Sequence, residues 1–260
     1  MEKDFDWADF VRQLENKLRL RTFPICLKFI EKVEEMEKIE KIRRFKNSRR
    51  YLCQLFSLAR MYGWTIGATA DELGVTCAYI TGLREDYHPT LLDGYARIWF
   101  KNKEEGIKKI ETMPRIPPGK YEALVVTPLT LKKVEPDIIM FYGTPAQIQF
   151  AINAFQWEKY ERFEFFSVGE SSCADVIAQA YLTKKPAVTI PCFGERRYGG
   201  ALEDEMVVAF PPSYAEKLLR GLEGLYRAGI RYPIPLFGAL ADTFVALPES
   251  YKKAYEKLKK

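Results

Sequence analysis

Residues 163–212, FEFFSVGESSCADVIAQAYLTKKPAVTIPCFGERRYGGALEDEMVVAFPP, carry the clearest succession of elements in the chain. The stretch predicts a strand, a turn of small residues, a helix, a second strand, a loop rich in glycine and arginine, and a last strand closed by two prolines. Cys173 and Cys192 lie at its two turning points. We therefore expect a functional site at these turns.

A similar order of elements is predicted earlier in the chain. The order strand, helix, strand, helix is expected at 23–29, 49–62, 64–67 and 70–83, and again at 138–142, 145–157, 163–168 and 172–182. In each half a cysteine, Cys77 or Cys173, lies near the start of the last helix. Crossovers of this kind favour parallel strand pairs with helices outside. The sequence thus predicts an α/β fold of two loosely similar strand-helix-strand-helix halves, forming mixed sheets flanked by helices.

Domain boundaries are predicted from prolines and charge. The proline-rich segment 114–120 cannot form regular structure and is the predicted linker. It would join an N-terminal half of a single domain, 1–113, to a C-terminal half, 121–230, that carries the main site. Residues 231–260 are predicted to form a wrapping loop and a basic C-terminal helix. A strand is also considered at 95–100.

Composition indicates an ordinary globular protein. The 260 residues are 47% hydrophobic and 29% charged, and lysines of the final segment supply much of the net charge of +5. No apolar run approaches the roughly 18–20 residues that cross a bilayer, and the acidic, aromatic N-terminus lacks a secretion signal. We expect a cytoplasmic protein without membrane contact. Abundant Lys and Glu with scarce His, Asn and Gln resemble the composition of hyperthermophile proteins.

A helix-turn-helix for DNA binding is one alternative, at residues 64–83. Small, glycine and branched residues stand where this motif needs a close helix crossing. The recognition helix would be 76–84, however, and it offers only Arg84 before two acids, Glu85 and Asp86. Phosphate contacts require cationic side chains. The sequence therefore argues against a nucleic-acid partner.

The turn at 169–172 and the loop at 193–200 hold the polar residues that are hardest to explain by folding alone. Backbone N–H groups at a helix start attract anions, and two adjacent arginines can grip a carboxylate or phosphate. The serines could equally cap the helix, and the arginines could pair with the acids at 203–205. The candidate ligand-binding residues are Glu170, Ser171, Ser172, Arg196 and Arg197.

Metal binding would depend on dispersed cysteines. The chain has no CxxC motif, and its single histidine, His88, excludes a histidine-rich metal site. Cys26 lies in an apolar run and is expected to be a buried hydrophobe. The other four would have to be brought together by the fold. The candidate metal ligands are Cys53, Cys77, Cys173 and Cys192.

Several blocks of sequence together resemble a known family. In chain order they are CQLFSLARMYG (53–63), GVTCAYITGL (74–83), PPGKYEALVVTPL (117–129), PDIIMFYGTPAQ (136–147), GESSC (169–173), TIPCFGERRY (189–198) and EDEMVVAFP (203–211). The set resembles the uncharacterised archaeal and bacterial proteins of domain-of-unknown-function family 169, over roughly residues 10–230. The resemblance implies that the four candidate ligands are recurrent cysteines, whereas Cys26 stands where other members carry a small apolar residue. It implies no reaction.

The leading hypothesis from these patterns is an iron–sulfur cluster held by the four cysteines, with zinc as the less favoured metal. Four thiolates on a closed cluster favour a redox, electron-transfer or sensing role with a redox partner. If one iron were open, Glu170, Asp175 or Glu195 could move a proton beside it; no catalytic residue is assigned. The alternative is a metal-free module that binds a small anionic ligand in the cleft between the halves.

Overall fold

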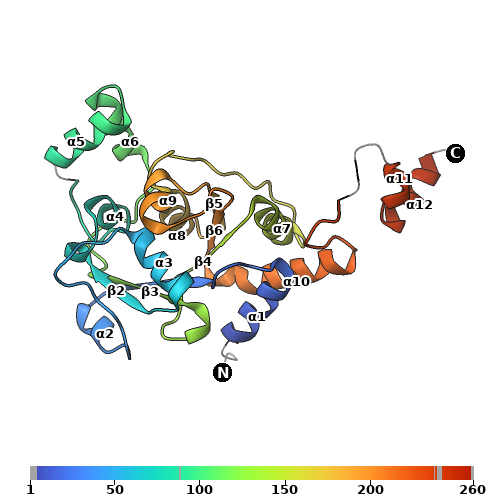
Figure 1. The fold of residues 1–260 in the computed structure, drawn as a ribbon, viewed down its shortest axis with the longest axis horizontal. Helices are drawn as coiled ribbons and strands as arrows, with labels where there is room; N and C mark the ends of the chain where they lie inside the picture. The colour runs from blue at the N-terminus through green and yellow to red at the C-terminus, as the bar shows by residue number, and fades with distance from the viewer. Residues whose placement is uncertain (1–4, 88, 237, 239–241, 259–260) are drawn as a thin grey trace.

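The protein is built on one six-stranded sheet with helices on both faces (Figure 1). The computed structural model describes residues 5–87, 89–236, 238 and 242–258. The predicted α/β class is confirmed. Along the sheet the strand order is β2-β3-β1-β4-β6-β5. The strands are β1 (Ile25–Ile30), β2 (Ile66–Thr69), β3 (Ala123–Pro128), β4 (Ile138–Gly143), β5 (Ala187–Thr189) and β6 (Met206–Phe210).

Neighbouring strands are antiparallel at every pairing between the described strands, so the expected mixed sheet with parallel pairs was wrong in this detail. The reason lies in the order of the strands. β1 and β2 do run in the same direction, but β3 lies between them; β4 and β5 also run in the same direction, with β6 between them. The sheet thus consists of two three-stranded units, β2-β3-β1 and β4-β6-β5, which meet where β1 pairs with β4.

This order also shows how the predicted halves relate to the sheet. The first unit is completed by β3, which follows the predicted linker 114–120 in the chain. The linker itself is irregular, as its prolines require. The two units are therefore joined by the short connection between β3 and β4.

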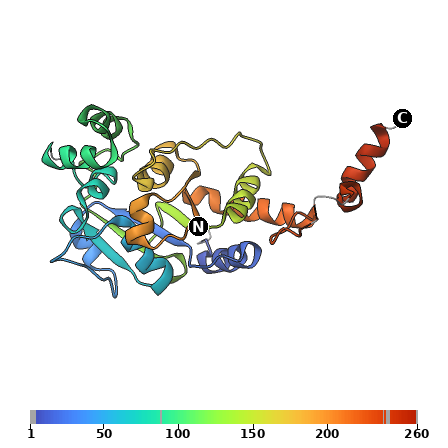
Figure 2. The ribbon, with the colours of Figure 1, turned by 45° about the horizontal axis from the view of Figure 1, so that its top comes forward.

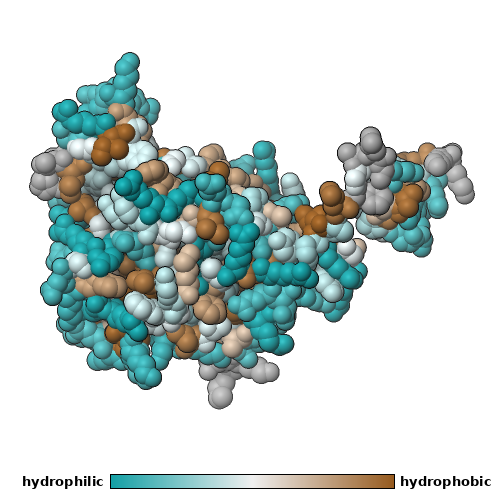
Figure 3. Space-filling view, in the orientation of Figure 1, coloured by the Kyte–Doolittle hydropathy of each residue, from teal (hydrophilic) through white to brown (hydrophobic). Residues whose placement is uncertain are grey.

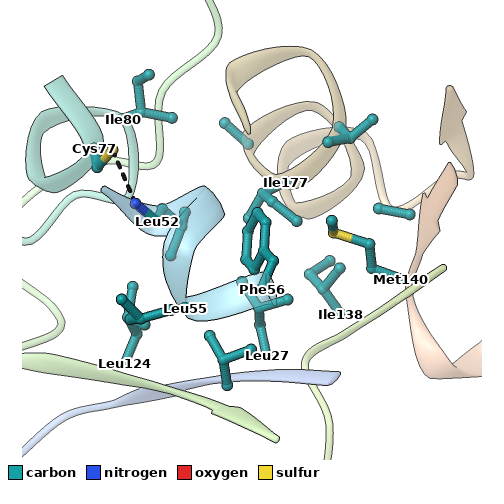
Figure 4. Packing of buried hydrophobic residues seen from close by; sticks show 14 of the residues in the cluster. Leu27, Leu52, Leu55, Phe56, Cys77, Ile80, Leu124, Ile138, Met140 and Ile177 are labelled. Carbon is teal, nitrogen blue, oxygen red and sulfur yellow. Dashed lines mark hydrogen bonds between the residues drawn. The ribbon is translucent and has the colours of Figure 1, made fainter. Parts of the chain in front are cut away.

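Helices cover both faces because the strands are apolar on both sides. In β1, Leu27 packs into the core beneath α3 (Leu52–Tyr62), whereas its neighbour Cys26 packs on the opposite side with Leu14 of α1 (Trp7–Leu18). Successive side chains of a strand point to opposite faces. The α3 side is shown in Figure 4, where Leu55 and Phe56 meet strand residues.

Most of the remaining helices cover one face of the sheet or the other. With α3 lie α4 (Val75–Ile80), α6 (Lys103–Thr112), α8 (Gln179–Thr183) and the π-helical turn Ala174–Ala178 that precedes it. With α1 lie α7 (Pro145–Gln156) and α10 (Ala215–Arg227). The others are α2 (Val33–Glu37), α5 (Pro89–Trp99), α9 (Phe193–Gly199), α11 (Thr243–Ala246) and α12 (Glu249–Leu258).

Helix signals in the sequence agree well with the structure. Thr144 caps α7, accepting a hydrogen bond from the Gln147 amide, and Pro145 takes the first helical position, where its missing N–H costs nothing. Gly63 ends α3 in the left-handed conformation, as expected for a residue that closes a helix. The start of α7 and the end of α3 could thus be predicted from local sequence alone.

Four predicted elements differ. Residues 163–168 form no strand, because the Val168 amide bonds to the Asp175 carboxylate and the segment crosses the surface instead. Residues 95–100 belong largely to α5, and the expected glycine- and arginine-rich loop is α9. The helix at 70–83 is a 3-10 turn, Ala70–Glu72, followed by the short α4.

The C-terminal segment stands apart from the sheet. In both ribbon views α11 and α12 lie beyond the end of α10 and do not wrap around the body (Figures 1 and 2). Neither helix has a buried residue. The connection that leads to them is coloured hydrophobic in Figure 3. None of the described helices has the length and apolar character needed to cross a membrane.

Helices α7 and α10 pack closely at Gly221. A β-carbon added there would lie 2.0 Å from the carbonyl oxygen of Ala154, a backbone atom that cannot yield. We expect Gly221→Ala to lower the free energy of unfolding by about 1–3 kcal/mol, as other overpacked cores do. Gly94→Ala, in α5 with open space around it, is the control and should be neutral or stabilising. Equal losses in urea denaturation would contradict this packing.

Candidate functional site

The four candidate cysteines come from four separate segments on one side of the sheet. Cys53 lies in the first turn of α3 and Cys77 lies in α4. Cys173 precedes the π-helical turn Ala174–Ala178, and Cys192 is the residue at which α9 begins. π-helical turns are rare and often occur at functional sites. The segments are far apart in sequence and meet only through the fold.

One direct contact and several electrostatic interactions link these thiols. Cys77 and Cys173 share a hydrogen bond, and Cys53 interacts electrostatically with both Cys77 and Cys192. The Leu52 amide donates to Cys77 Sγ at 3.3 Å, a bond drawn in Figure 4. Cys53 Sγ donates to the Gly194 carbonyl at 3.7 Å. The structure thus places Cys77 and Cys173 in contact, with Cys53 and Cys192 in their electrostatic surroundings.

Burial controls the protonation of the cluster of thiols. It raises the pKa of Cys53 well above its usual value. In the Cys77–Cys173 pair, the shared hydrogen bond lowers the pKa of Cys77 and raises that of Cys173, so the pair holds one proton more easily than none. Thiols in such surroundings ionise readily only when a cation compensates their charge.

Cys26 is separated from the site by the sheet. It is 2% exposed and packs among the residues of α1, α7 and α10. Burial raises its pKa to about 12, as expected of an inert structural thiol. Its predicted role as a buried hydrophobe is confirmed. Among the described residues, no three His, Cys, Asp or Glu side chains are arranged to hold a single metal ion.

A buried carboxylate, Glu195, lies beside the thiols. It accepts hydrogen bonds from the Tyr142 and Ser172 hydroxyls, and it interacts electrostatically with Cys53 and Cys173. Burial is the main reason that its pKa is raised. Ser172 thus holds Glu195 and does not cap a helix, which answers one of the alternatives left open by the sequence.

The raised pKa of Glu195 predicts a pH dependence of stability. An acid whose pKa is higher in the folded than in the unfolded state stabilises the fold below the unfolded value of about 4.5, and this contribution is lost as pH rises toward the folded value. We expect the unfolding free energy of metal-free protein to fall by about 1.4 kcal/mol for each pH unit that separates the two pKa values. Glu195→Gln should flatten the profile, measured by urea denaturation between acidic and neutral pH. An unchanged slope would show that folding does not raise the pKa of Glu195.

A second polar group surrounds Glu170. Its carboxylate accepts from Tyr95 Oη at 2.6 Å and from Ser171 Oγ at 2.7 Å. Lys109 Nζ donates to Ser171 Oγ at 2.9 Å and lies 3.6 Å from the Glu170 carboxylate. Lys109 is 8% exposed, and burial lowers its pKa. It also interacts electrostatically with Cys173, so a buried cation lies near that thiol.

The turn before Cys173 carries backbone strain. Ser171 has a φ of 75°, in the left-handed region that favours glycine, directly after the glycine-containing turn at Gly169. Its bond to Lys109 holds it in place. Such conformations persist where surrounding contacts require them, and they cluster at functional sites.

The two arginines are not part of this buried group. Arg196 donates to the Leu202 carbonyl, and Arg197 lies against the rings of Phe193 and Tyr198. They do not pair with the acids at 203–205 either, since Asp204 bonds to Arg21 and Glu205 bonds to Arg60. Described contacts therefore do not join Glu170 and Ser171 to the arginines, although Arg196 acts electrostatically on Glu195.

The helix-turn-helix interpretation of 64–83 is wrong. The segment begins with β2, a strand within the sheet, and continues through a 3-10 turn into a helix of six residues. The two crossing helices that the motif requires are therefore missing from this described segment. His88 lies outside the described residues.

Several site residues were missed from sequence alone. Tyr95 lies in a segment considered as a strand, Lys109 lies in a short charged helix, and Tyr142 is one of many apolar strand residues. None has a local signal that separates it from its neighbours. These residues are recognised only from their side-chain partners, as Lys109 is from Glu170. Such partners come from distant parts of the chain, so they depend on the tertiary structure.

A separate hollow of about 450 Å³ lies away from the thiols, between the segment 161–168 and the outer edge of β5. Asp175 reaches it, 6% exposed, while holding the Val168 amide and the Thr189 hydroxyl. Burial raises the pKa of Asp175. Asp175 is thus used to fasten the surface segment.

Comparison with known proteins gives a family but no activity. Residues 13–221 match the sequence model of DUF169, whose description reads "Uncharacterised ArCR". The "Uncharacterized protein MJ0308" of Methanocaldococcus jannaschii is 32% identical over 176 residues, which are 66% of this chain and 75% of that protein. No solved structure matches the chain.

Proposed function

Starting from a chain that belongs to the DUF169 family, we propose that it binds an iron–sulfur cluster through Cys53, Cys77, Cys173 and Cys192. The observation that carries the proposal is their arrangement: four cysteines from four segments lie within electrostatic range of one another, with Cys77 and Cys173 in contact, while Cys26 lies across the sheet. Thiolates are the usual ligands of such clusters. Five free thiols also suit a reducing compartment such as the cytoplasm.

The surroundings suit a group that carries positive charge. Without one, burial raises the pKa of Cys53, the hydrogen bond with Cys77 raises the pKa of Cys173, and Glu195 adds a buried acid. Binding of metal releases the thiol protons and compensates the charge of the thiolates. The Leu52 amide already donates to Cys77 Sγ, a contact that stabilises a thiolate.

Zinc is the less favoured metal for a physical reason. Structural zinc ions stabilise domains that lack a sufficient core. Here extensive buried clusters cover both faces of the sheet, so the fold has its own core. A metal at the cysteines would serve another purpose than holding the chain together.

The chain's own residues favour a closed, redox or sensing site over substrate chemistry. When bound, the cluster supplies one-electron transfer. Lys109 places a cation near Cys173, and Glu170 and Tyr95 hold that lysine in position. The Glu195 carboxylate already accepts hydrogen bonds from Tyr142 and Ser172, which argues against a role in moving a proton to or from a substrate.

Anaerobic purification tests the proposal directly. We expect a coloured protein whose visible absorption bleaches on reduction, with iron and acid-labile sulfide in comparable amounts and little zinc. Zinc alone would replace the cluster by a mononuclear site. A colourless protein without iron, sulfide or zinc, which also fails to take up a cluster on reconstitution, would overturn the metal proposal.

A further inference from the structure

An exposed surface of aromatic and cationic side chains lies directly over the cysteines. The ring of Tyr51 stacks on that of Tyr198 at 5.0 Å, and the ring of Trp99 meets that of Phe193 at 5.7 Å. The Arg197 guanidinium lies between Phe193 and Tyr198, 5.8 and 5.7 Å from the two ring centres. These five residues form what we call the α9 surface.

The α9 surface is open to solvent although its members are large and mostly apolar. The exposed fractions are 54% for Phe193, 46% for Tyr198, 44% for Tyr51 and 39% for Trp99. Tyr, Trp, Phe and Arg are the residues most enriched in protein interfaces and their energetic centres. An exposed contiguous patch of this kind marks a binding surface more often than an accident of composition.

The residues of this surface adjoin the proposed metal ligands, both along the chain and where α9 packs on α3. Cys192 directly precedes Phe193, and Tyr51 stands two residues before Cys53. A β-carbon on Gly199 would lie 2.8 Å from that of Cys53, so α9 rests directly on α3. A partner seated here would approach the thiols closely enough for electron transfer.

The charge of the surface is positive and largely uncompensated. Among the described residues, Arg196 and Arg197 form no salt bridge, and Arg49 and Arg50, just before Tyr51, bond only to backbone carbonyls. Exposed acids nearby in sequence include Asp71, whose carbonyl Arg49 contacts, Glu203, and Asp204, which is already paired with Arg21. The cations outnumber them, so an acidic partner is favoured.

We propose that the α9 surface docks an acidic electron-carrier protein over the cysteines. The inference rests on the proposed iron–sulfur function, because a carrier needs a centre to exchange electrons with. Aromatic anchors would supply contact area, and the arginines would supply orientation and rapid, salt-dependent association.

Binding of oxidised plant-type ferredoxin, a small acidic carrier, is the test. By calorimetry at low salt we expect measurable binding that weakens as salt rises, and Arg197→Glu should weaken it by about tenfold or more. Arg231→Glu is the matched control, since Arg231 also lies over an exposed tyrosine, 4.2 Å from the Tyr226 ring, but beyond α10. It should leave binding unchanged.

Three results would overturn the docking proposal: no ferredoxin binding, equal effects of the two substitutions, or tighter binding of oligothymidylate with the same loss on Arg197→Glu. The last would assign the surface to single-stranded nucleic acid. Iron content measured on the same samples separates the two proposals. If the protein holds a cluster but does not bind ferredoxin, the docking proposal fails and the proposed function stands. If protein without metal binds ferredoxin in a way that depends on Arg197, the docking surface stands and the proposed function fails.

Discussion

Replacement of Cys53, Cys77, Cys173 or Cys192 by serine is expected to remove most of the iron and sulfide, to about a tenth of the wild-type content or less, whereas Cys26→Ser should retain all of it. Under the proposed function each of the four contributes a thiolate to the cluster, and a serine hydroxyl is a poor substitute. Cys26 faces the other side of the sheet and is the matched control, also buried and also in the core. Iron, sulfide and visible absorption measured after anaerobic purification check the expectation.

The pattern across the four variants distinguishes a closed from an open cluster. Four similar losses support a cluster whose irons are all ligated by cysteine. One variant that keeps its cluster but changes its redox or ligand response would identify an open iron instead. Retention of full iron in all four variants would refute the ligand set. Circular dichroism of each variant establishes that a loss of iron does not reflect a loss of fold.

The sorting of the cysteines could be predicted from the sequence because two independent patterns agree. Cys26 lies within an apolar run, and the resemblance to the family sets it apart from the other four. The structure places it across the sheet, as that sorting requires. Sequence could not show that Cys77 and Cys173 touch, since their contact joins elements from different halves.

Helices with clear caps and periodicity were predicted well, whereas elements that depend on neighbours were not. Thr144 and Pro145 start α7 by local chemistry. Residues 163–168 alternate like a strand, yet the edge of β5 beside them does not pair with them, so the segment stays irregular. Strand formation needs a partner, and partners are chosen by the whole sheet.

The strand order was also beyond local reasoning. The first predicted crossover, from 23–29 to 64–67, correctly implies that β1 and β2 run in the same direction. The second ends at 163–168, which forms no strand, and the strand that runs in the same direction as β4 is β5. Neither crossover reveals that β3 and β6 insert between the members of these pairs. The chain returns to the centre of each unit as β3 or β6, and no local sequence pattern before these strands indicates that position.

Arg60→Met is expected to lower the free energy of unfolding by about 3–5 kcal/mol, because it leaves the Glu205 carboxylate buried without its partner. Arg60 is 1% and Glu205 3% exposed, and the two make a bidentate pair with N–O distances of 2.9 and 3.0 Å. Urea denaturation measures the loss. Arg227→Met, which removes one member of an exposed pair with Glu223, is the control and should have little effect.

The double variant Arg60→Met/Glu205→Leu separates the charge from the packing. Apolar replacement of both partners of a buried pair is often neutral or stabilising, so most of the loss should be recovered. Arg60 also lies 3.8 Å from the Tyr142 ring and donates to the Gly200 carbonyl that follows α9. If the double variant regains stability but binds less iron, the pair serves to position Tyr142, Glu195 and α9 beside the thiols. If Arg60→Met alone costs no more than Arg227→Met, the pair is hydrated in solution and cannot have that role.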